Sequence, residues 1–388
     1  MEFLQSFALA FAFVALVCWR RKITPFKVVY FLYTKTFVGA LFHSHLLKKA
    51  RSKPPHTRRA RTHTYETFSV VEVPLLSDNY AFLLVDHGTG RVAAVDPCDA
   101  QRVAIAFEEL KESWAGARRL RLAAVLCTHK HLDHAGGNAD MARRFPGLDV
   151  VGGRSEGCQH TTVPLNHRGR FKLGETLVEA LLTPCHTKGH MCFLATALSA
   201  SSSSSSSSYS SSSSSSSSGG APGAVPVLFT GDCLFVGGAG KFFEGDGNQA
   251  YQSLCVTLGE GVDERCRFFC GHEYTVSNLR FAAWLEPGNA ACAAKLRWAE
   301  AQRAAGESTL PGILAEEKAG HNPFMRAAQP GVVAAVQRHW PSVAEQLLSG
   351  RGEDDQQAPL LLPGEVMAAV RALKDKNAHI PIPSQAKQ

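Results

Sequence analysis

The sequence lacks the cysteine spacing that a zinc ribbon or a disulfide framework needs. It has 11 cysteines, an odd number, spread through 388 residues, and none of them forms a CxxC motif. The nearest pair, Cys266 and Cys270, lies in a segment that predicts a strand. Others, such as Cys127, Cys192 and Cys255, lie in apolar runs, where free cysteine packs as a small hydrophobic residue. A small disulfide-rich domain is therefore excluded, and a reducing compartment is favoured.

Charged residues are also scarce, and the excess of basic ones is confined to one end. Only 19% of the residues are charged and 45% are hydrophobic, which excludes a disordered chain or a repetitive fibre. Residues 1–65 carry 12 Lys and Arg against one acidic residue, whereas the remainder carries 29 against 33. This distribution argues against a nucleic-acid-binding body and favours an N-terminal arm near an anionic surface.

The N-terminus contains an apolar run, FLQSFALAFAFVALVCW, at residues 3–19. Its length matches the shortest membrane-spanning helices, which need about 17–25 residues. Glu2 precedes the run and Arg20, Arg21 and Lys22 follow it, which is not the charge order of a secretory signal. The positive-inside rule keeps the following body on the cytoplasmic side. We expect residues 1–22 to be a membrane anchor; an organelle-targeting segment and a cleaved signal are the alternatives.

Two further segments are not typical of a folded core. Residues 23–65 predict a basic juxtamembrane arm, in which 26–50 fit a helix lying in the membrane interface or, alternatively, one packed on the body. Residues 51–65 predict a linker. Residues 199–224 predict a disordered insert, since 17 of the 18 residues at 201–218 are serine and have nothing to bury.

The body predicts strands and helices in alternation. Apolar runs bounded by turn residues predict strands at 69–76, 80–86, 91–96, 122–128, 176–184, 191–198, 225–232 and 267–274. Helical spacing predicts helices at 99–112 and 136–144. Beyond Tyr274 the whole pattern is helical. We therefore expect an α/β domain over 66–274 and a helical domain over 275–388.

A dense cluster of metal-ligand residue types directly follows the predicted strand 122–128. It consists of His129, His131, Asp133 and His134, which fall within six residues. Packing hardly explains four such side chains in one turn, and imidazole with carboxylate suits Zn²⁺, Fe or Mn. These four residues alone do not complete a site, so the remaining ligands are expected at the ends of other strands.

Three more candidates each follow an apolar run, and they are His186, Asp232 and His272. Any one of them alone is more simply a capping or hydrogen-bonded residue at the rim of a sheet. Jointly they complete two metal positions, the first made of His129, His131 and His186, and the second of Asp133, His134 and His272. Asp232 would bridge the two. His190 competes with His186, but it opens the next predicted strand.

The chemistry of such a pair is hydrolysis. Two dications about 3.5–4 Å apart need an anion between them, and a hydroxide held by Asp133 and Asp232 can share this role with the bridging carboxylate. The pKa of the shared water falls towards about 7, which gives a nucleophile without Ser or Cys. The residues therefore predict metal-assisted hydrolysis of an acyl compound or ester.

The motifs also carry a family resemblance. THKHLDHAGGN, SDNY at 77–80, VDP at 95–97, TPCHTKGH and FTGDCLF resemble the metallo-β-lactamase superfamily. CGHEYTVSNLRFA, EPGNA and NPFMR are similar to glyoxalase II, the hydroxyacylglutathione hydrolase family, and this resemblance covers roughly residues 68–376. The arm YFLYTKTFVGALF resembles the membrane-associated paroxysmal nonkinesigenic dyskinesia protein branch of that family.

The resemblance implies an αββα metallo-β-lactamase sandwich, with two divalent metal ions (zinc first, iron or manganese otherwise) at one sheet edge and a C-terminal helical domain that helps to hold glutathione. The substrate would be an S-(2-hydroxyacyl)glutathione thioester such as S-D-lactoylglutathione. All seven ligand positions match those of the family. For the location, the first expectation is a membrane-anchored chain with its body on the cytoplasmic side, and the resemblance makes the mitochondrion the alternative.

Family substrate contacts match four residues, Lys241, Tyr274, Arg371 and Lys374. The sequence departs from the family at Phe243, where Tyr is usual, and at Leu132, where Trp is usual, so the rate is in question. The alternative function is a membrane-associated regulatory or scaffold protein with a retained metal site and weak catalysis. Within enzymes, a sulfur dioxygenase with one iron or a β-lactamase shares the same sandwich.

Overall fold

The computed structural model describes residues 30, 32, 36–58, 60–198, 224–341 and 361–377. The predicted anchor at 1–22 and nearly all of the predicted serine-rich insert lie outside these residues. The chain divides into two compact units, 1–53 and 54–388. In the described part of the chain, every helix is too short or too polar to cross a membrane.

In the described part of the first unit, the longest element is the helix α3 (Phe37–Arg51). The helix begins after Thr36, whose hydroxyl accepts a hydrogen bond from the backbone N–H of Val38. Phe37 and Leu41 lie one turn apart and are 76% and 65% exposed. The last turn carries three basic side chains, Lys48, Lys49 and Arg51.

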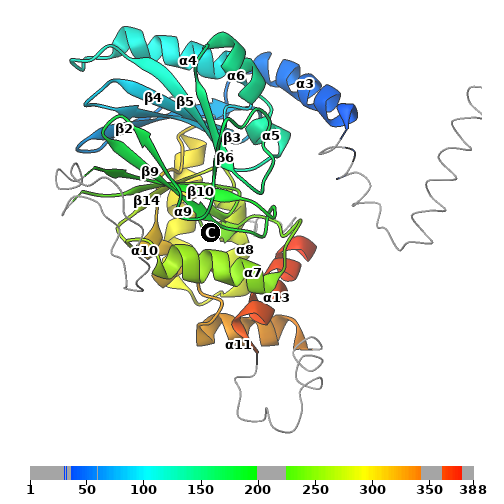
Figure 1. Ribbon diagram of the computed structural model, residues 1–388. Coiled ribbons are helices and arrows are strands. Elements are labelled where there is room, and N and C mark those ends of the chain that lie inside the picture. Colours follow the sequence, from blue (N-terminus) through cyan, green and yellow to red (C-terminus); the bar gives the residue numbers. More distant parts are fainter. Residues whose placement is uncertain are drawn as a thin grey trace, which may run out of the picture. The chain divides into compact units, whose positions relative to one another are not determined.

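The second unit contains two β-sheets packed face to face (Figure 1). The first sheet has the order β1 (Thr62–Thr64), β2 (Phe68–Leu75), β3 (Asn79–Asp86), β4 (Arg91–Val95), β5 (Arg121–Cys127), β6 (Asp149–Gly153) and β7 (Val163–Leu165). The second has the order β15 (Gly312–Ile313), β14 (Arg267–Cys270), β11 (Val227–Gly231), β10 (Met191–Ala197), β9 (Thr176–Leu182) and β8 (Arg170–Leu173). A short hairpin joins β12 (Leu234–Phe235) to β13 (Gly238–Ala239).

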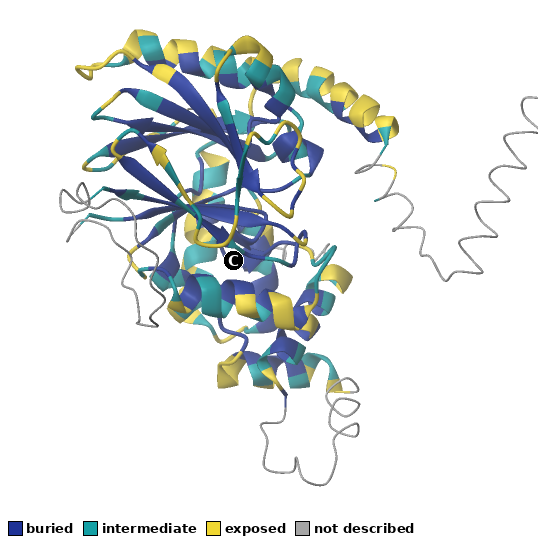
Figure 2. Ribbon diagram, viewed as in Figure 1, coloured by how far each residue is buried: buried dark blue, intermediate teal, exposed yellow. Residues whose placement is uncertain are grey.

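Aromatic side chains fill the space between the two sheets. Phe82 of the first sheet meets Phe229 and Phe269 of the second, with ring centroids 5.6 and 5.3 Å apart. Every residue of β3 is buried, and Figure 2 shows both sheets as buried layers. Strands covered on both faces read as continuous apolar runs, which is why the sequence pattern identified them so readily.

Helices cover the outer faces of the sandwich (Figure 1). α4 (Ala100–Ser113) and α6 (Asn138–Arg144) pack on the first sheet, with Val103 and Phe107 of α4 in a shared core. The other side carries the helical elements α7 (Gly247–Tyr251), η2 (Gln252–Glu260), α8 (Thr275–Leu285), α9 (Ala290–Ala304), α10 (Leu314–Glu316), η3 (Glu317–His321), α11 (Pro330–His339) and α13 (Pro363–Lys376). The predicted αββα sandwich with a helical C-terminal region is confirmed. Of the strands in the two sheets, β1, β6, β7, β8 and β15 were not predicted. The expectation that the region beyond Tyr274 is wholly helical was wrong at β15, which pairs antiparallel with β14.

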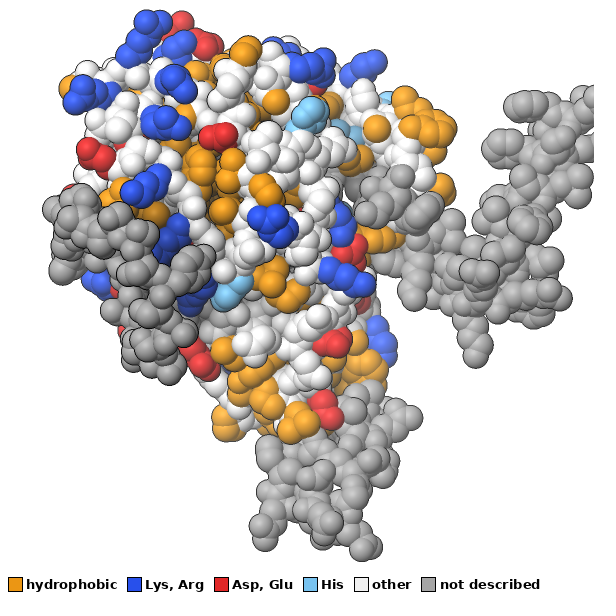
Figure 3. Space-filling view, viewed as in Figure 1, with side chains coloured by type: hydrophobic (Ala, Val, Ile, Leu, Met, Phe, Trp, Pro, Cys, Tyr) orange, Lys and Arg blue, Asp and Glu red, His pale blue; other side chains and the backbone are white. Residues whose placement is uncertain are grey.

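Residues 54–64, which the sequence analysis placed in the basic arm, lie in the second unit. Thr62–Thr64 forms β1 and pairs antiparallel with β2, at the edge of the first sheet. Arg58 N donates to the carbonyl of Gly306, at 2.8 Å. On the face drawn in Figure 3, the basic side chains of the body are scattered among acidic and apolar ones.

Candidate metal centre

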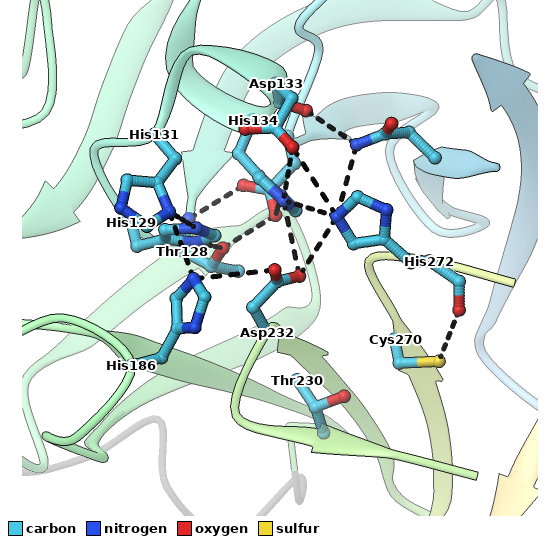
Figure 4. A network of polar contacts seen from close by, with 12 residues as sticks. Thr128, His129, His131, Asp133, His134, His186, Thr230, Asp232, Cys270 and His272 are labelled. Atoms are coloured by element: carbon cyan, nitrogen blue, oxygen red, sulfur yellow. Dashed lines mark hydrogen bonds and ion pairs between the residues drawn. The ribbon is translucent and has the colours of Figure 1, made fainter. Parts of the chain in front are cut away.

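The seven predicted ligands converge at one edge of the sandwich (Figure 4). Four of them follow β5, in the turn and short helix α5 (Leu132–Ala135). The others follow β9, β11 and β14, so each comes from the point where a strand ends. Strand ends at one sheet edge place side chains together that are far apart in sequence. This convergence explains why residues up to 143 positions apart, from 129 to 272, can share one site.

The first ligand group is His129, His131 and His186, whose nitrogen atoms face one another. Nε2 of His129 lies 3.1 Å from Nδ1 of His131, and Nε2 of His186 lies 3.0 Å from the same Nδ1. All three rings are buried. Burial lowers the pKa of each, and brings that of His131 to about 3. These imidazoles are therefore neutral at neutral pH, which is the form that binds a cation.

The second group is Asp133, His134 and His272. The Nε2 atoms of the two histidines lie 3.2 Å apart, and Oδ2 of Asp133 lies 3.6 Å from Nε2 of His272. Burial alone would lower the histidine pKa values, but the nearby carboxylates outweigh it. Asp232 raises the pKa of His272 to about 10, and likewise that of His134 well above its usual value.

Asp232 lies between the two groups and faces each with one oxygen. Its Oδ2 is 3.5 Å from Nε2 of His186, while its Oδ1 is 3.3 Å from Nε2 of His134 and 3.5 Å from Nε2 of His272. Oδ1 is buried, and none of the described residues donates a well-oriented hydrogen bond to it. A buried carboxylate oxygen without a donor, facing ring nitrogens, fits a position between two cations.

The outward nitrogens of the ligand histidines are also occupied. Nδ1 of His134 lies 3.0 Å from Oδ2 of Asp96, and Nδ1 of His272 lies 2.8 Å from Oδ1 of Asp78. Nδ1 of His186 lies 3.0 Å from the carbonyl oxygen of Lys241. Histidines that bind metals almost always donate their other N–H to a carboxylate or carbonyl, which fixes the tautomer. The pattern therefore directs the remaining nitrogen of each ring into the site.

Asp96 and Asp78 contact the predicted ligands His134 and His272, and the sequence motifs of metal-ligand residues did not single them out. Asp96 also approaches His129 and His134 closely enough to resemble a ligand. Its oxygens, however, accept hydrogen bonds from the N–H and hydroxyl of Thr128, at 2.8 and 2.7 Å. Both oxygens of Asp96 are therefore engaged with Thr128 and His134 within the protein. The only signal in the sequence was the presence of both residues in the family motifs VDP and SDNY.

His190 has a supporting position, and His186 is the histidine that faces the site. Nε2 of His190 accepts a hydrogen bond from the N–H of Asp232, at 3.2 Å, and its Nδ1 lies 2.9 Å from the Thr183 hydroxyl. Both ring nitrogens are thus engaged within the protein. His190 holds the backbone of Asp232 in place, which explains why it is buried so close to the ligands.

Two glutamates join the turns that carry the first ligand group. Glu156 accepts hydrogen bonds from the N–H groups of Lys130 and Gly189, at 3.0 and 2.8 Å. Glu244 accepts from Nζ of Lys130 and from the N–H of Lys188, at 2.6 and 2.9 Å. Lys130 stands between two ligands in sequence, and the 186–190 turn carries the third. The carboxylates therefore fix the distance between the two turns.

The predicted substrate residues lie at varied distances from these ligands. Phe243 contacts the ligand histidines His131 and His186, with ring centroids 5.8 and 5.1 Å away. Tyr274 stacks on His272 at 4.7 Å and an interplanar angle of 7°. Lys241 is exposed, and its backbone carbonyl meets His186.

The two basic residues of α13 are engaged with the protein. Arg371 is buried and donates to the carbonyl of Ala239, at 3.2 Å, and to Asp375, at 2.7 Å. Its Nε meets no acceptor among the described residues. Nζ of Lys374 donates to the side-chain oxygen of Asn278. Burial, and next the charge of Arg371, hold the pKa of Lys374 well below its usual range.

Comparisons with known proteins agree with this geometry. Residues 77–196 match the model of the metallo-beta-lactamase superfamily, and residues 273–377 match that of the hydroxyacylglutathione hydrolase C-terminus. A cytoplasmic hydroxyacylglutathione hydrolase of Arabidopsis thaliana is 39% identical over 264 residues, which are 68% of this chain and 90% of the relative.

Two solved structures are similar at lower identity. One is ETHE1 from Myxococcus xanthus, with 21% identity and a TM-score of 0.42 over 64% of this chain and 80% of that one. The other is a metallo-beta-lactamase from Staphylococcus aureus, with 18% identity and a TM-score of 0.43 over 68% of this chain and 63% of that one.

Proposed function

Since the chain belongs to the hydroxyacylglutathione hydrolase (glyoxalase II) family of the metallo-β-lactamase superfamily, we propose that it hydrolyses S-(2-hydroxyacyl)glutathione thioesters. S-D-lactoylglutathione is one such substrate, and the products are glutathione and a 2-hydroxy acid. The observation that carries this proposal is the carboxylate of Asp232, which faces a ligand group with each of its two oxygens.

The donor set fits two divalent metal ions. His129, His131 and His186 would hold one ion, Asp133, His134 and His272 the other, and Asp232 both. When bound, such a pair supplies a water with a pKa lowered towards about 7 and a Lewis acid for the thioester carbonyl. Imidazole and carboxylate ligands accept zinc, iron or manganese, with zinc the first expectation.

The acidic residues of the site prepare the attacking water. Burial opposes the ionisation of Asp133 and Asp232, but His134 and His272 hold both carboxyl pKa values below their usual range. Both are thus ionised at neutral pH and can accept hydrogen bonds from the water. Carboxylates with such low pKa values orient the water, and its proton passes to solvent. The water oxygen bonds to the thioester carbon, the C–S bond breaks, and the sulfur leaves as glutathione after taking up a proton.

Four residues around the ligands would bind the glutathione moiety. The exposed ammonium of Lys241 lies on the segment that supports His186, and Tyr274 stacks on His272. On α13, Arg371 and Lys374 would approach the substrate from the C-terminal helical region. Glutathione carries two carboxylates, and an anion beside Lys374 would favour the protonated form of its amine, which burial and Arg371 disfavour in the free chain. Arg371 already contacts Asp375, and Lys374 already contacts Asn278. A bound substrate would therefore compete with these contacts or be held in addition to them.

The proposal is tested by thioester turnover of the purified full chain loaded with Zn²⁺. We expect hydrolysis of S-D-lactoylglutathione and two metal ions per chain. His131→Ala removes one ligand of the first group and should abolish most turnover. If two ions bind but turnover does not exceed that of His131→Ala, the chain is instead the regulatory protein with weak catalysis that the departure at Phe243 suggests. A single iron per chain would point to dioxygenase chemistry.

We further propose that the N-terminal segment attaches the chain to a membrane, as in the paroxysmal nonkinesigenic dyskinesia protein branch. The apolar run at 3–19 is followed by basic residues. Helix α3 exposes Phe37 and Leu41 at its start and carries three basic residues in its last turn. Deletion of residues 2–22 should move the chain from the membrane to the supernatant after centrifugation. If the deleted chain stays with the membrane, α3 holds it there, and the anchor assignment fails.

A further inference from the structure

A short segment ahead of the family-matched regions is built into the support of the metal centre. His56 and Thr57, which we call the strap, precede residue 77, where the first matched region begins. Thr57 is only 1% exposed, so it is not part of a solvated linker. Both strap residues and the ligands lie in the same compact unit.

A single arginine of α9 holds the strap from outside. The guanidinium of Arg303 donates to the carbonyl of His56 at 2.6 Å and to the hydroxyl of Thr57 at 3.3 Å. The same group donates to the carbonyl of Glu307 at 2.6 Å, which fixes its orientation. A planar guanidinium that binds three acceptors at once is poorly replaced by the flexible ammonium of lysine.

On its inner side, the strap contacts the first residues of β3, directly after the turn that joins β2 to β3. Nε2 of His56 donates to the carbonyl of Asn79, at 2.8 Å, so its Nδ1 accepts from the Thr57 hydroxyl, at 3.1 Å. The Thr57 oxygen also lies 3.2 Å from the hydroxyl of Tyr80. That hydroxyl donates to Glu273, next to a ligand in sequence, at 2.7 Å.

Asn79 in turn contacts the second ligand group. Its side-chain amide donates to the carbonyl of Asp133, at 3.1 Å, and lies 3.4 Å from Nε2 of His272. Asn79 and His272 also form an isolated backbone bridge. The preceding residue, Asp78, holds Nδ1 of His272. One continuous set of contacts therefore runs from Arg303 through the strap and this turn to the second group, while none of these contacts involves the first group.

We propose that His56 and Thr57, held by Arg303, are positioning residues for the second metal position. This inference rests on the proposed function, because it concerns the same metal centre. The strap holds the segment of Asp78 and Asn79, whose side chains contact His272 and the backbone of Asp133. Without it, that segment gains freedom, and the second group loses its geometry while the first group keeps its own support from Glu156 and Glu244.

The test compares zinc retention in full-length variants. Arg303→Met removes the donors of Arg303 to the strap and also its ion pair with Glu273, at 3.7 Å. Thr57→Val acts on the strap alone, because it removes the hydroxyl with little change of shape. The matched control is Arg280→Met. It breaks the pair between Arg280 of α8 and Glu300 of α9, the helix that also carries Arg303, but it does not touch the strap. A competing chelator withdraws the two Zn²⁺ ions in two steps. The step that is lost in His272→Ala belongs to the second metal position, and we call it the second zinc step; the other is the first zinc step. Trypsin cleavage after Arg58 or Arg61 reports whether the strap is released.

We expect Arg303→Met and Thr57→Val to weaken the second zinc step about 10-fold, the low end for partners outside the ligand set. The first step and the control should stay within about twofold of wild type, and Arg303→Lys should recover only part of the loss. The inference would be overturned if the variants weakened zinc binding equally in both steps. It would also be overturned if trypsin cleaved the strap of a variant while its zinc binding was unchanged in both steps. If wild type shows two zinc steps but hydrolyses no thioester, the proposed function fails while this inference stands.

Discussion

Oδ2 of Asp96 lies 3.0 Å from Nδ1 of His134, and this contact directs the opposite nitrogen of the ring into the metal centre. Asp96 has the unusual φ of 48°, and its carboxylate reaches Thr128, the residue after β5. There it also accepts two hydrogen bonds from Thr128. A residue 38 positions before the histidine thus decides which tautomer that histidine adopts.

Asp96→Asn should weaken zinc binding at the second position. Asparagine tolerates positive φ, so the backbone is retained, but its amide cannot replace both carboxylate oxygens as acceptors. We expect the affinity to fall about 10–100-fold, as for other partners of metal ligands. Chelator competition measures the loss. Asp99→Asn is the control, because Asn caps the start of α4 as well as Asp does. Equal effects of both changes would contradict the assigned role.

Zinc binding should release protons mainly at the second position. In the metal-free chain, Asp232 raises the pKa of His272 to about 10 and also raises that of His134, so both are protonated at pH 7. Burial lowers the pKa of His131 to about 3, so its ring is already neutral at pH 7 and does not have to lose a proton before it binds zinc. Calorimetric titration in buffers of different ionisation enthalpy counts the protons. Similar release in the two steps would show that this difference between the groups is wrong.

The stability of the metal-free chain should fall between about pH 6.5 and 10 because of His272. Its folded pKa, about 10, is above the ordinary value of 6.5, so its stabilising contribution is complete below pH 6.5 and is lost as the pH rises through 10. Thermal unfolding across this range, compared with His272→Gln, isolates the effect from other titrating groups. If the two chains lose stability in parallel with rising pH, the histidine is not the cause.

Glu156→Gln should loosen the first metal position. The Glu156 carboxylate accepts from two backbone N–H groups and lies 3.9 Å from Nζ of Lys130. In glutamine, an NH₂ group replaces one of the two accepting oxygens, so one of the backbone N–H groups would lose its acceptor. We expect a loss of about 1–3 kcal/mol in the free energy of unfolding, together with weaker binding in the first zinc step. Glu108→Gln, at an exposed pair with Lys111, should change neither quantity.

Phe243→Tyr should improve turnover. The ring lies beside His131 and His186, where the family usually has a tyrosine, and the added hydroxyl could donate a hydrogen bond to the substrate. A gain of about 1 kcal/mol corresponds to about fivefold in kcat/KM. Steady-state kinetics with S-D-lactoylglutathione measures it, with Phe242→Tyr, the neighbouring position, as control. A decrease would mean that the pocket has been reshaped around the phenylalanine.

Much of the fold could be predicted from the sequence because its strands are buried on both faces. β3 and β5 read as unbroken apolar runs, and α8 follows the predicted helical pattern from its first residue. β7 and β8 were missed because they are short and half exposed, so their composition resembles that of loops. β1 was missed for the same reason, and its basic flank resembled a linker.

The sequence by itself determined which side chains could hold a metal, because imidazole and carboxylate groups directly after buried strands have few other uses at that density. It could not determine which oxygen of Asp232 faces which group, or that Asp96 and the strap support the centre. Those residues are ordinary in type and distant in sequence. Only the packing of the two sheets and α9 brings them within hydrogen-bonding distance, and hydrogen bonds depend on that distance rather than on sequence pattern.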